Sequence, residues 1–350
     1  MLMRGRKKLS VILAGLVLLV TFTGCGSAHE KIDNGMQLIK DLDYSGALLQ
    51  FEEAATEGEN DRLITRGQGI AYMGLAEYDQ AISSFQASLS GSDGWVQDID
   101  YDVNYYLAAA YIKNGQYQEA KEIYDAILAL RPSEENAYLL RGNVLLALSD
   151  YEHAKEDFDK VISMDAKNYD RIIEIYQVLD SYGYRQVGLE LLQNALDAGE
   201  EKMNSYDKGR IYYYMGEYQK AYMALEEAKN TGGAESYLYL GKAYEATGDY
   251  NYASSVYNSY ISKDTTNAQV YNQLGLCEMN KQDYQKALEA FQAGMQIENN
   301  GMMQTLSFNE IVAYEYLGDY QKASVLLDNY LKAYPDDEKA KREQIFLSTR

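Results

Sequence analysis

Few side chains in this 350-residue sequence could do chemistry, and they do not form a complete catalytic set. The two histidines, His29 and His153, have no second histidine or thiol near them in the sequence, so we interpret both as solvated surface residues. Gly241-Lys242 lacks the upstream glycine and the following Ser or Thr of a phosphate loop. A Gly-x-Ser-x-Gly elbow and a zinc-ligand spacing are also missing. We therefore expect no enzyme, no cofactor and no metal.

Four polar side chains alternate along one segment in the manner of the first ligands of a calcium loop: Asp98, Asp100, Asp102 and Asn104. The sixth position is Val103 and the twelfth is Ala109, where a calcium loop needs glycine and a bidentate glutamate. Acidic residues at the start of a helix also cap it and complement its dipole. We favour helix capping over a calcium site.

The N-terminal segment carries a processing signal that must be set aside before the fold is considered. Four basic residues, at positions 4, 6, 7 and 8, precede an apolar run from Leu9 to Val20 that is short for a membrane-spanning helix. The run is followed by Phe22-Thr23-Gly24-Cys25, which resembles the lipobox of bacterial lipoproteins. The resemblance implies a signal peptide over residues 1–24, diacylglycerol on the sulfur of Cys25, and a short tether over residues 25–27. The alternative is an ordinary secretory signal whose cleavage site contains a cysteine.

A lipidated Cys25 implies a protein attached to the cell membrane on its extracytoplasmic face. In a two-membrane bacterium that face is the periplasmic side of the outer membrane, because Gly26 stands where an aspartate would favour retention at the inner membrane. The second cysteine, Cys277, then has no disulfide partner, and we expect it to be a small buried apolar residue.

The charge balance excludes one class of partner. The chain has 32 basic and 53 acidic side chains, and removal of the four basic residues of the signal leaves a net charge of about −25. Nucleic-acid binding needs clustered Lys and Arg that displace counterions, so we expect no nucleic-acid partner. An acidic surface also argues against direct binding to an anionic bilayer.

A repeat runs through the rest of the chain. A tyrosine three residues before an alanine recurs at spacings of 34, 39, 34, 67, 32, 34 and 36 residues. The tyrosines are Tyr44, Tyr78, Tyr117, Tyr151, Tyr218, Tyr250, Tyr284 and Tyr320. The gap of 67 holds one degenerate unit, in which Gly188 takes the place of the alanine. Each alanine is followed four residues later by a large apolar or aromatic side chain, one helical turn away on the same face.

This period and its anchors resemble the tetratricopeptide repeat family. The resemblance implies an all-α fold, a right-handed superhelical solenoid of about nine helix-turn-helix repeats over residues 28–337. The repeats are predicted at approximately 28–61, 62–95, 101–134, 135–168, 169–201, 202–233, 234–267, 268–301 and 304–337. Glycines at Gly115, Gly216, Gly248 and Gly318 are expected to accept the left-handed backbone that closes a helix, and residues 338–350 are predicted to form a capping helix.

The family pattern also predicts which side chains face the concave groove of such a solenoid. Mapped one by one, the groove residues are Tyr105, Leu139, Asn143, Ile173, Gln177, Tyr206, Arg210, Tyr213, Tyr214, Lys242 and Met279. Tyrosine combines a large contact area with a polar tip and is common at interfaces. The alternative is that a tyrosine-rich chain simply uses tyrosine on its helices.

Two cations in this set, Arg210 and Lys242, suggest a ligand that carries a carboxylate next to apolar groups. Pairing inside the chain, for example of Lys242 with Glu245 or Glu235, is the alternative. We therefore expect a membrane-anchored envelope adaptor that binds a protein or peptide. A cell-wall or glycan binder that stacks sugars on groove tyrosines, and a non-catalytic subunit of an envelope complex, are the competing predictions.

Overall fold

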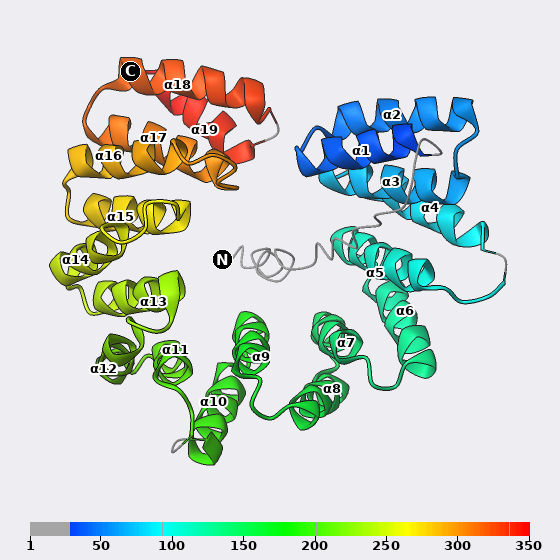
Figure 1. Cartoon of the computed structure of the whole chain (residues 1–350), viewed down its shortest axis with the longest axis horizontal. Coiled ribbons are helices and arrows are strands. Elements are labelled where there is room, and N and C mark those ends of the chain that lie inside the picture. Colours follow the sequence, from blue (N-terminus) through cyan, green and yellow to red (C-terminus); the bar gives the residue numbers. More distant parts are fainter. Residues whose placement is uncertain (1–28, 93, 200–201, 336) are drawn as a thin grey trace, which may run out of the picture. The chain divides into compact units, whose positions relative to one another are not determined.

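The computed structural model describes residues 29–92, 94–199, 202–335 and 337–350, and the regular elements in these ranges are all α-helices (Figure 1). The all-α prediction is therefore confirmed. The signal sequence and Cys25 lie outside the described residues. The chain divides into two compact units, Met1–Leu191 and Leu192–Arg350, which are described separately.

Within its described residues, the first unit contains nine complete helices and the start of a tenth. They are α1 (Glu30–Lys40), α2 (Tyr44–Glu57), α3 (Asp61–Gly74), α4 (Tyr78–Ser90), α5 (Asp98–Lys113), α6 (Tyr117–Leu130), α7 (Glu135–Ala147), α8 (Tyr151–Met164), α9 (Tyr169–Ser181) and α10 (Arg185–Gly199). The boundary between the units falls inside α10.

In the part of the second unit that the structure describes, nine further helices follow. They are α11 (Ser205–Met215), α12 (Tyr218–Ala228), α13 (Gly233–Ala246), α14 (Tyr250–Ile261), α15 (Ala268–Asn280), α16 (Tyr284–Met295), α17 (Met303–Tyr316), α18 (Tyr320–Ala333) and α19 (Glu338–Leu347). None of the described helices is both long enough and apolar enough to cross a membrane.

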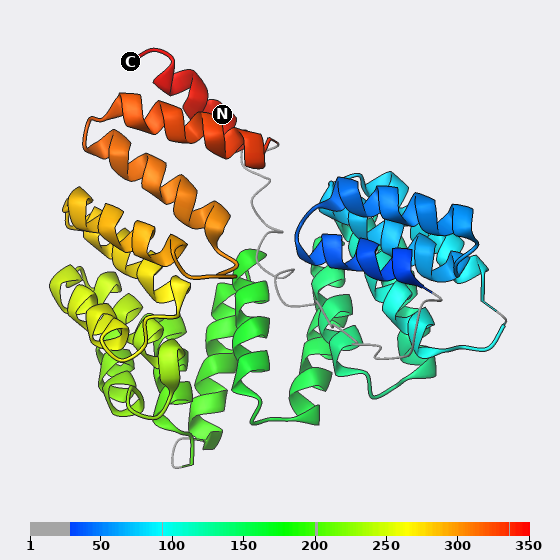
Figure 2. The same cartoon turned by 45° about the horizontal axis from the view of Figure 1, so that its top comes forward.

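Consecutive helices pack as hairpins, and the first helices of neighbouring hairpins also touch (Figures 1 and 2). In the first unit α3 contacts α1 and α5, and in the second unit α13 contacts α11 and α15. Each hairpin therefore covers the apolar face that its neighbour leaves open, which is how stacked repeats build a continuous core.

The alanine anchors of the sequence pattern are fully buried in this core. All eight are 0% exposed: Ala47, Ala81, Ala120, Ala154, Ala221, Ala253, Ala287 and Ala323. The large side chain one turn later is also buried in each hairpin, and in most of them it faces a small residue of the first helix. At Gly241, for example, a Cβ atom would overlap the ring of Tyr257. The repeat pattern thus indicates which residues are buried where two helices of a hairpin pack together.

The turns between the helices of a hairpin share one backbone conformation. Gly115 and Gly216 have φ of 79°, and Gly248 and Gly318 have φ of 80°, as expected for a left-handed closing residue. Four other hairpins place a side chain at the same position, with φ between 60° and 66°: Leu42, Ala76, Ser149 and Gln282. The position two residues before the repeat tyrosine is therefore left-handed whichever residue occupies it.

Candidate partner-binding site

One face of α11 carries four of the predicted groove residues. Tyr206, Arg210, Tyr213 and Tyr214 are spaced at i, i+4, i+7 and i+8, so the helical period places them on one side. The neighbouring first helix, α13, contacts α11 and presents Tyr239 toward this face. A single pair of packed helices therefore brings these aromatic side chains together.

Four tyrosines, Tyr206, Tyr213, Tyr214 and Tyr239, form what we call the tyrosine cluster. The ring centroid of Tyr239 lies 6.2 Å from that of Tyr206, 5.7 Å from that of Tyr213 and 6.0 Å from that of Tyr214, all edge to face. The hydroxyl oxygens of Tyr214 and Tyr239 are 3.0 Å apart and share a hydrogen bond. Such edge-to-face contacts stabilise aromatic groups beyond the area that they bury, so the cluster is a preformed aromatic surface.

The two predicted cations have different roles. Arg210 is only 8% exposed, its Nη2 pairs with Oδ1 of Asp207 one turn earlier, and its guanidinium lies 4.4 Å from the ring centroid of Tyr206. Lys242 is half-buried, with its Nζ 5.4 Å from the ring centroid of Tyr239. Among the described residues, no carboxylate forms an ion pair with Lys242. Pairing with a carboxylate inside the chain thus applies to Arg210, whereas the ammonium of Lys242 lies against an aromatic ring.

Beside the tyrosine cluster lies a hollow of about 240 Å³, lined by Tyr213, Lys242, Glu245, Ala246, Tyr250 and Asn280. We call it the Lys242 hollow. Three first helices supply polar groups to it: α11 gives Tyr213, α13 gives Lys242 and Glu245, and α15 gives Asn280. It therefore joins a cation, a phenol, a carboxyl group and an amide.

The donors of this hollow suit a carboxylate. Burial raises the pKa of Tyr213, so its phenol keeps its proton at neutral pH. The Tyr213 hydroxyl makes no hydrogen bond to any described residue. A protonated phenol and an ammonium in one hollow can both donate to a carboxylate oxygen, and hydrogen bonds to a charged acceptor are the stronger kind.

Glu245 supplies the carboxyl group of the same hollow. Burial raises the pKa of Glu245, while the hydrogen bond from the Tyr257 hydroxyl, at 2.5 Å, and the charge of Lys242 oppose that rise. Because Glu245 accepts from Tyr257, it is held against the core and does not pair with Lys242.

The other predicted groove residues lie in different surroundings. In the first unit, Leu139 and Ile173 are buried, and Leu139 packs in an apolar cluster with Phe158. Tyr105 has its ring 6.1 Å from that of buried Tyr124. Asn143 and Gln177 are half-buried.

In the second unit, Met279 packs against the core that contains Phe291, outside the tyrosine cluster. The assignment of Met279 and of the five first-unit residues to a binding surface stays a prediction.

Five residues of the site were not in the predicted groove set: Tyr239, Glu245, Ala246, Tyr250 and Asn280. Tyr239 could have been found, because it precedes Lys242 by three residues and so lies one helical turn away on the same face. Asn280 could not have been found from the sequence, because its place in the hollow depends on how closely α15 approaches α13.

The acidic side chains at residues 98–102 cap the start of α5 and form ion pairs with arginines. Asp100 accepts a hydrogen bond from the backbone N–H of Gln97 at the start of α5, and its other oxygen pairs with Arg62. Asp102 pairs with Arg66. Within the described ranges, no group of three or more His, Cys, Asp and Glu side chains is arranged to hold a metal ion.

The chain is similar in sequence to several other proteins. It is 27% identical over 217 residues to RNA polymerase II-associated protein 3 of Xenopus tropicalis, a match that covers 62% of this chain and 30% of that protein. It is 24% identical to TPR repeat-containing protein MJ1428 of Methanocaldococcus jannaschii (58% and 36%) and 21% identical to BBSome complex member BBS4 of Bos taurus (79% and 53%). The match thus spans only about a third of the length of the first two relatives.

Solved structures with a similar arrangement include a tetratricopeptide repeat protein from Parabacteroides merdae, with a TM-score of 0.42, 18% identity, and coverage of 71% of this chain and 98% of that one. The Cut9–Hcn1 heterotetramer of the APC/C has a TM-score of 0.41, 14% identity, and coverage of 92% and 77%.

Models of tetratricopeptide repeats match residues 72–144, 135–168, 235–265 and 268–300. These segments include hairpins of both units. The chain therefore contains tetratricopeptide repeats, and its fold is an all-α helical-repeat solenoid.

Proposed function

We propose that this protein is a binding scaffold that recognises a protein segment at the tyrosine cluster and the Lys242 hollow. The observation that carries the proposal is that Lys242 and Tyr213 line one hollow and both keep a donor that no described residue uses. The segment presents a carboxylate to these two donors and apolar side chains to the neighbouring tyrosine rings.

The same hollow also makes capture depend on pH. A bound carboxylate lies in the same hollow as Glu245, whose pKa burial already holds above its usual range. A negative ligand raises that pKa further, because like charges disfavour ionisation. Capture is therefore expected to strengthen as the pH falls toward the pKa of Glu245, provided that the carboxylate of the ligand stays ionised.

The test compares variants in a capture experiment on a membrane extract, followed by identification of the retained proteins. Lys242→Gln and Tyr213→Phe each remove one donor and keep most of the packing. Arg210 is left intact, because it is buried against Asp207 and its loss would disturb α11. Lys286→Gln is the matched control, since Lys286 is an exposed lysine of the same unit that pairs with Asp283.

The proposal expects each donor variant to lose the retained partner while Lys286→Gln keeps it. Capture that is equal in the parent and all three variants would contradict the proposal. Retention of cell-wall saccharide with no protein band would replace it with glycan binding.

We further propose that the scaffold is tethered to the extracytoplasmic face of the cell membrane through a lipid on Cys25. The support is the sequence alone: the basic segment, the apolar run and Thr23-Gly24-Cys25. Two or more acyl chains on one cysteine give a stable anchor. Cys25→Ser should move the protein out of the membrane fraction or leave it unprocessed, while Cys277→Ser, at the other cysteine, should not. Normal cleavage and unchanged membrane association of Cys25→Ser would refute the anchor.

A further inference from the structure

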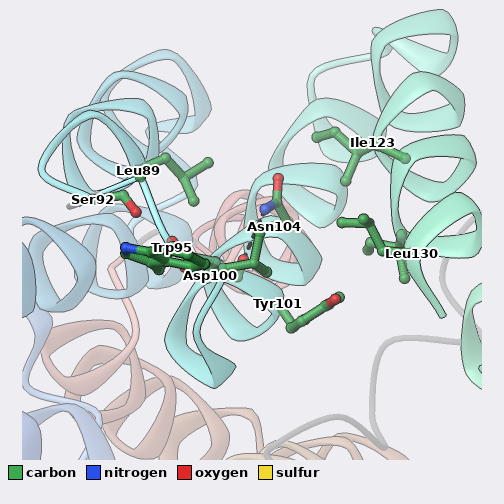
Figure 3. Close-up of a pocket in the computed structure, with 12 residues that line it drawn as sticks. Leu89, Ser92, Trp95, Asp100, Tyr101, Asn104, Ile123 and Leu130 are labelled. Atoms are coloured by element: carbon green, nitrogen blue, oxygen red, sulfur yellow. Dashed lines mark hydrogen bonds between the residues drawn. The ribbon is translucent and has the colours of Figure 1, made fainter.

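The two units differ in whether the charged groups beside an apolar surface are paired. In the first unit, an apolar pocket of about 310 Å³ lies beside Trp95 (Figure 3). The acidic side chains at this pocket are paired with arginines, Asp98 with Arg131 and Asp100 with Arg62. These charges compensate one another and favour no charged partner. The C-terminal end of the second unit differs, because a carboxyl group there has no cation among the described residues.

The last helix, α19, closes this end of the second unit with few buried side chains. It is ten residues long and packs against α18 (Figure 2). Ala340 and Leu347 are its buried residues, and they join an apolar cluster that contains Phe308 of α17 and Leu327 of α18. Ile345 is 70% exposed. Isolated helices shorter than about 12–15 residues are marginal in water, so α19 stays helical only while it is docked.

The carboxyl group without a cation belongs to Glu315 of α17. It meets a second carboxyl group, that of Glu343 on α19. The Oε1 atom of Glu315 is buried and has no hydrogen-bond partner in the described part of the chain. Two carboxylates in contact repel each other when both are ionised. The contact between α17 and α19 therefore contains an unfavourable pair where a cation would be favourable.

The basic side chains of α19 are engaged elsewhere. The ammonium of Lys339 lies 4.4 Å from the ring centroid of Phe308. Lys341 pairs with Glu338, and Arg342 donates to the backbone oxygen of Glu338. Burial and Glu343 raise the pKa of Glu315 to about 7. The other charged side chains of α16, α17 and α18 are not among the causes of this rise: Lys286, Glu289, Glu310, Lys322, Asp328 and Lys332.

We propose that α19 is a displaceable cap, and that the face of α17 and α18 beneath it is a docking site for an amphipathic helix of a partner protein. The partner helix carries a small residue, a lysine or arginine, and a leucine at the spacing of Ala340, Glu343 and Leu347. This spacing of i, i+3 and i+7 lies on one side of a helix. The cation of the partner pairs with Glu315, where α19 offers a second carboxylate.

The proposal does not rest on the proposed function, because the Lys242 hollow lies on other helices. It makes displacement depend on pH. At pH 8 Glu315 and Glu343 are both ionised, so α19 is repelled and an incoming cation is attracted. At pH 6 Glu315 keeps its proton, which retains the cap and removes the charge that the cation needs. Binding of the partner helix should therefore strengthen as the pH rises from 6 to 8.

The probes are fluorescent peptides with the sequence of residues 337–350, added to the full chain at pH 8 and physiological ionic strength. One peptide carries Glu343→Lys. The matched control carries Glu343→Gln and Ser348→Lys, so it has the same net charge without a cation opposite Glu315. Fluorescence anisotropy should show saturable binding of the first peptide. The control and the unchanged sequence should bind at least about tenfold more weakly, because they lack the charge-assisted hydrogen bond.

Three variants of the protein assign binding to the face beneath α19. Glu315→Gln should remove the preference for the Glu343→Lys peptide over its control, because the carboxylate is gone. Leu347→Asp places a charge in the apolar contact of α19, so it should release the cap and strengthen binding of the same peptide. Ile345→Asp, at the exposed position of α19, is the matched control and should bind as the parent does. Thermal unfolding checks that the repeats of each variant stay folded.

Equal binding of the two peptides of matched charge would overturn the proposal, since net charge alone would then explain capture. Equally tight binding of the unchanged sequence would also overturn it, because copies of the chain would then exchange α19 without any need for a cation. So would a preference that survives Glu315→Gln, or equal binding by the Leu347→Asp and Ile345→Asp variants. Glu315→Gln removes a like-charge contact and should not weaken the fold, so it decides the question even if Leu347→Asp fails to fold.

Discussion

The two units connect their hairpins with different polar contacts. In the first unit, arginines on first helices pair with carboxylates on the neighbouring first helix: Arg62 with Asp100, Arg66 with Asp102, and Arg171 with Glu135. In the second unit, the corresponding contacts are between uncharged groups. Tyr214 and Tyr239 join α11 to α13, and the side-chain amide of Asn309 on α17 donates to Asn272 on α15.

The comparison shows that the repeat pattern determines the apolar packing between hairpins. It does not determine which polar groups connect one hairpin to the next. An arginine that is paired to the next hairpin is unavailable to a ligand. A tyrosine that packs its ring on a neighbour can still offer its hydroxyl, and the Tyr213 hydroxyl is not used by any described residue. The second unit therefore combines an aromatic contact between hairpins with a donor that faces a hollow.

The largest expected effect lies in the first unit, where Arg141 joins three helices. Its guanidinium donates two hydrogen bonds to buried Asp157 on α8, at 2.8 and 2.7 Å, and one to Asp125 on α6 at 2.7 Å. Arg141→Met should lower the free energy of unfolding by about 3–5 kcal/mol, because it leaves a buried carboxylate without its cation. Chemical denaturation measures this value.

The double variant Arg141→Met with Asp157→Leu sharpens this test. Replacing both charges of a buried pair with apolar groups is often neutral, so the double variant should recover most of the loss. Burial raises the pKa of Asp157 above its usual value, so protonation of this group favours the folded state. The defect of Arg141→Met should accordingly shrink as the pH falls through the pKa of Asp157, and a defect independent of pH would count against this account.

The matching change in the second unit is Tyr257→Phe. The hydroxyl of Tyr257 donates to the half-buried carboxyl group of Glu245. Removal of the hydroxyl leaves that acceptor without its donor, which costs about 1–3 kcal/mol, and it should raise the pKa of Glu245 further. Thermal unfolding at pH 7 checks the loss, and Tyr252→Phe, at an exposed tyrosine of the same helix, is the control that should leave stability unchanged.

The sequence was sufficient for the fold class and for the packing points, because each hairpin repeats the same close contact. Small residues such as Ala154 recur at fully buried positions where helices pack, and the repetition makes them visible in the sequence. The site was only partly predictable. Family mapping placed Tyr206, Tyr213 and Lys242 near each other, but it gave Arg210 the same role as Lys242. The burial of Arg210 against Asp207 depends on how closely α11 packs against its neighbours. The repeat pattern of a single sequence does not predict that packing distance.

A smaller effect is expected at the C-terminal end of the second unit, where two carboxyl groups meet. Burial and the neighbouring Glu343 raise the pKa of Glu315 to about 7, from an ordinary value of 4.5. A group whose pKa is raised on folding stabilises the fold fully below its unfolded pKa, and this contribution is lost as the pH rises through its folded pKa. The packing of α19, which carries Glu343, should therefore weaken between about pH 4.5 and pH 7.

Hydrogen exchange of the α19 amides at pH 6 and pH 8, corrected for the intrinsic rate, measures this weakening. Glu343→Gln removes the like charge and should make the protection of α19 less dependent on pH. Lys341→Gln, on the same helix, removes an exposed pair with Glu338 and should keep the parent's dependence. Identical protection of α19 at both pH values in the parent would contradict the role of the Glu315–Glu343 pair.

The smallest expected effect concerns the turns, which both units share. Gln282 closes the turn before α16 with φ of 63°, where a side chain costs about 1–2 kcal/mol and glycine costs nothing sterically. Glycine also loses more conformational freedom on folding, by about 0.5–1 kcal/mol, so the two effects nearly offset. Gln282→Gly should thus raise the free energy of unfolding by less than about 1 kcal/mol. Glu289→Gly, at an exposed residue in the middle of α16, should lower it by about 1 kcal/mol. The free energies of unfolding of both variants are measured side by side in urea. Changes of opposite sign would assign the effect at Gln282 to the backbone conformation of the turn, and changes of the same sign would contradict that cause.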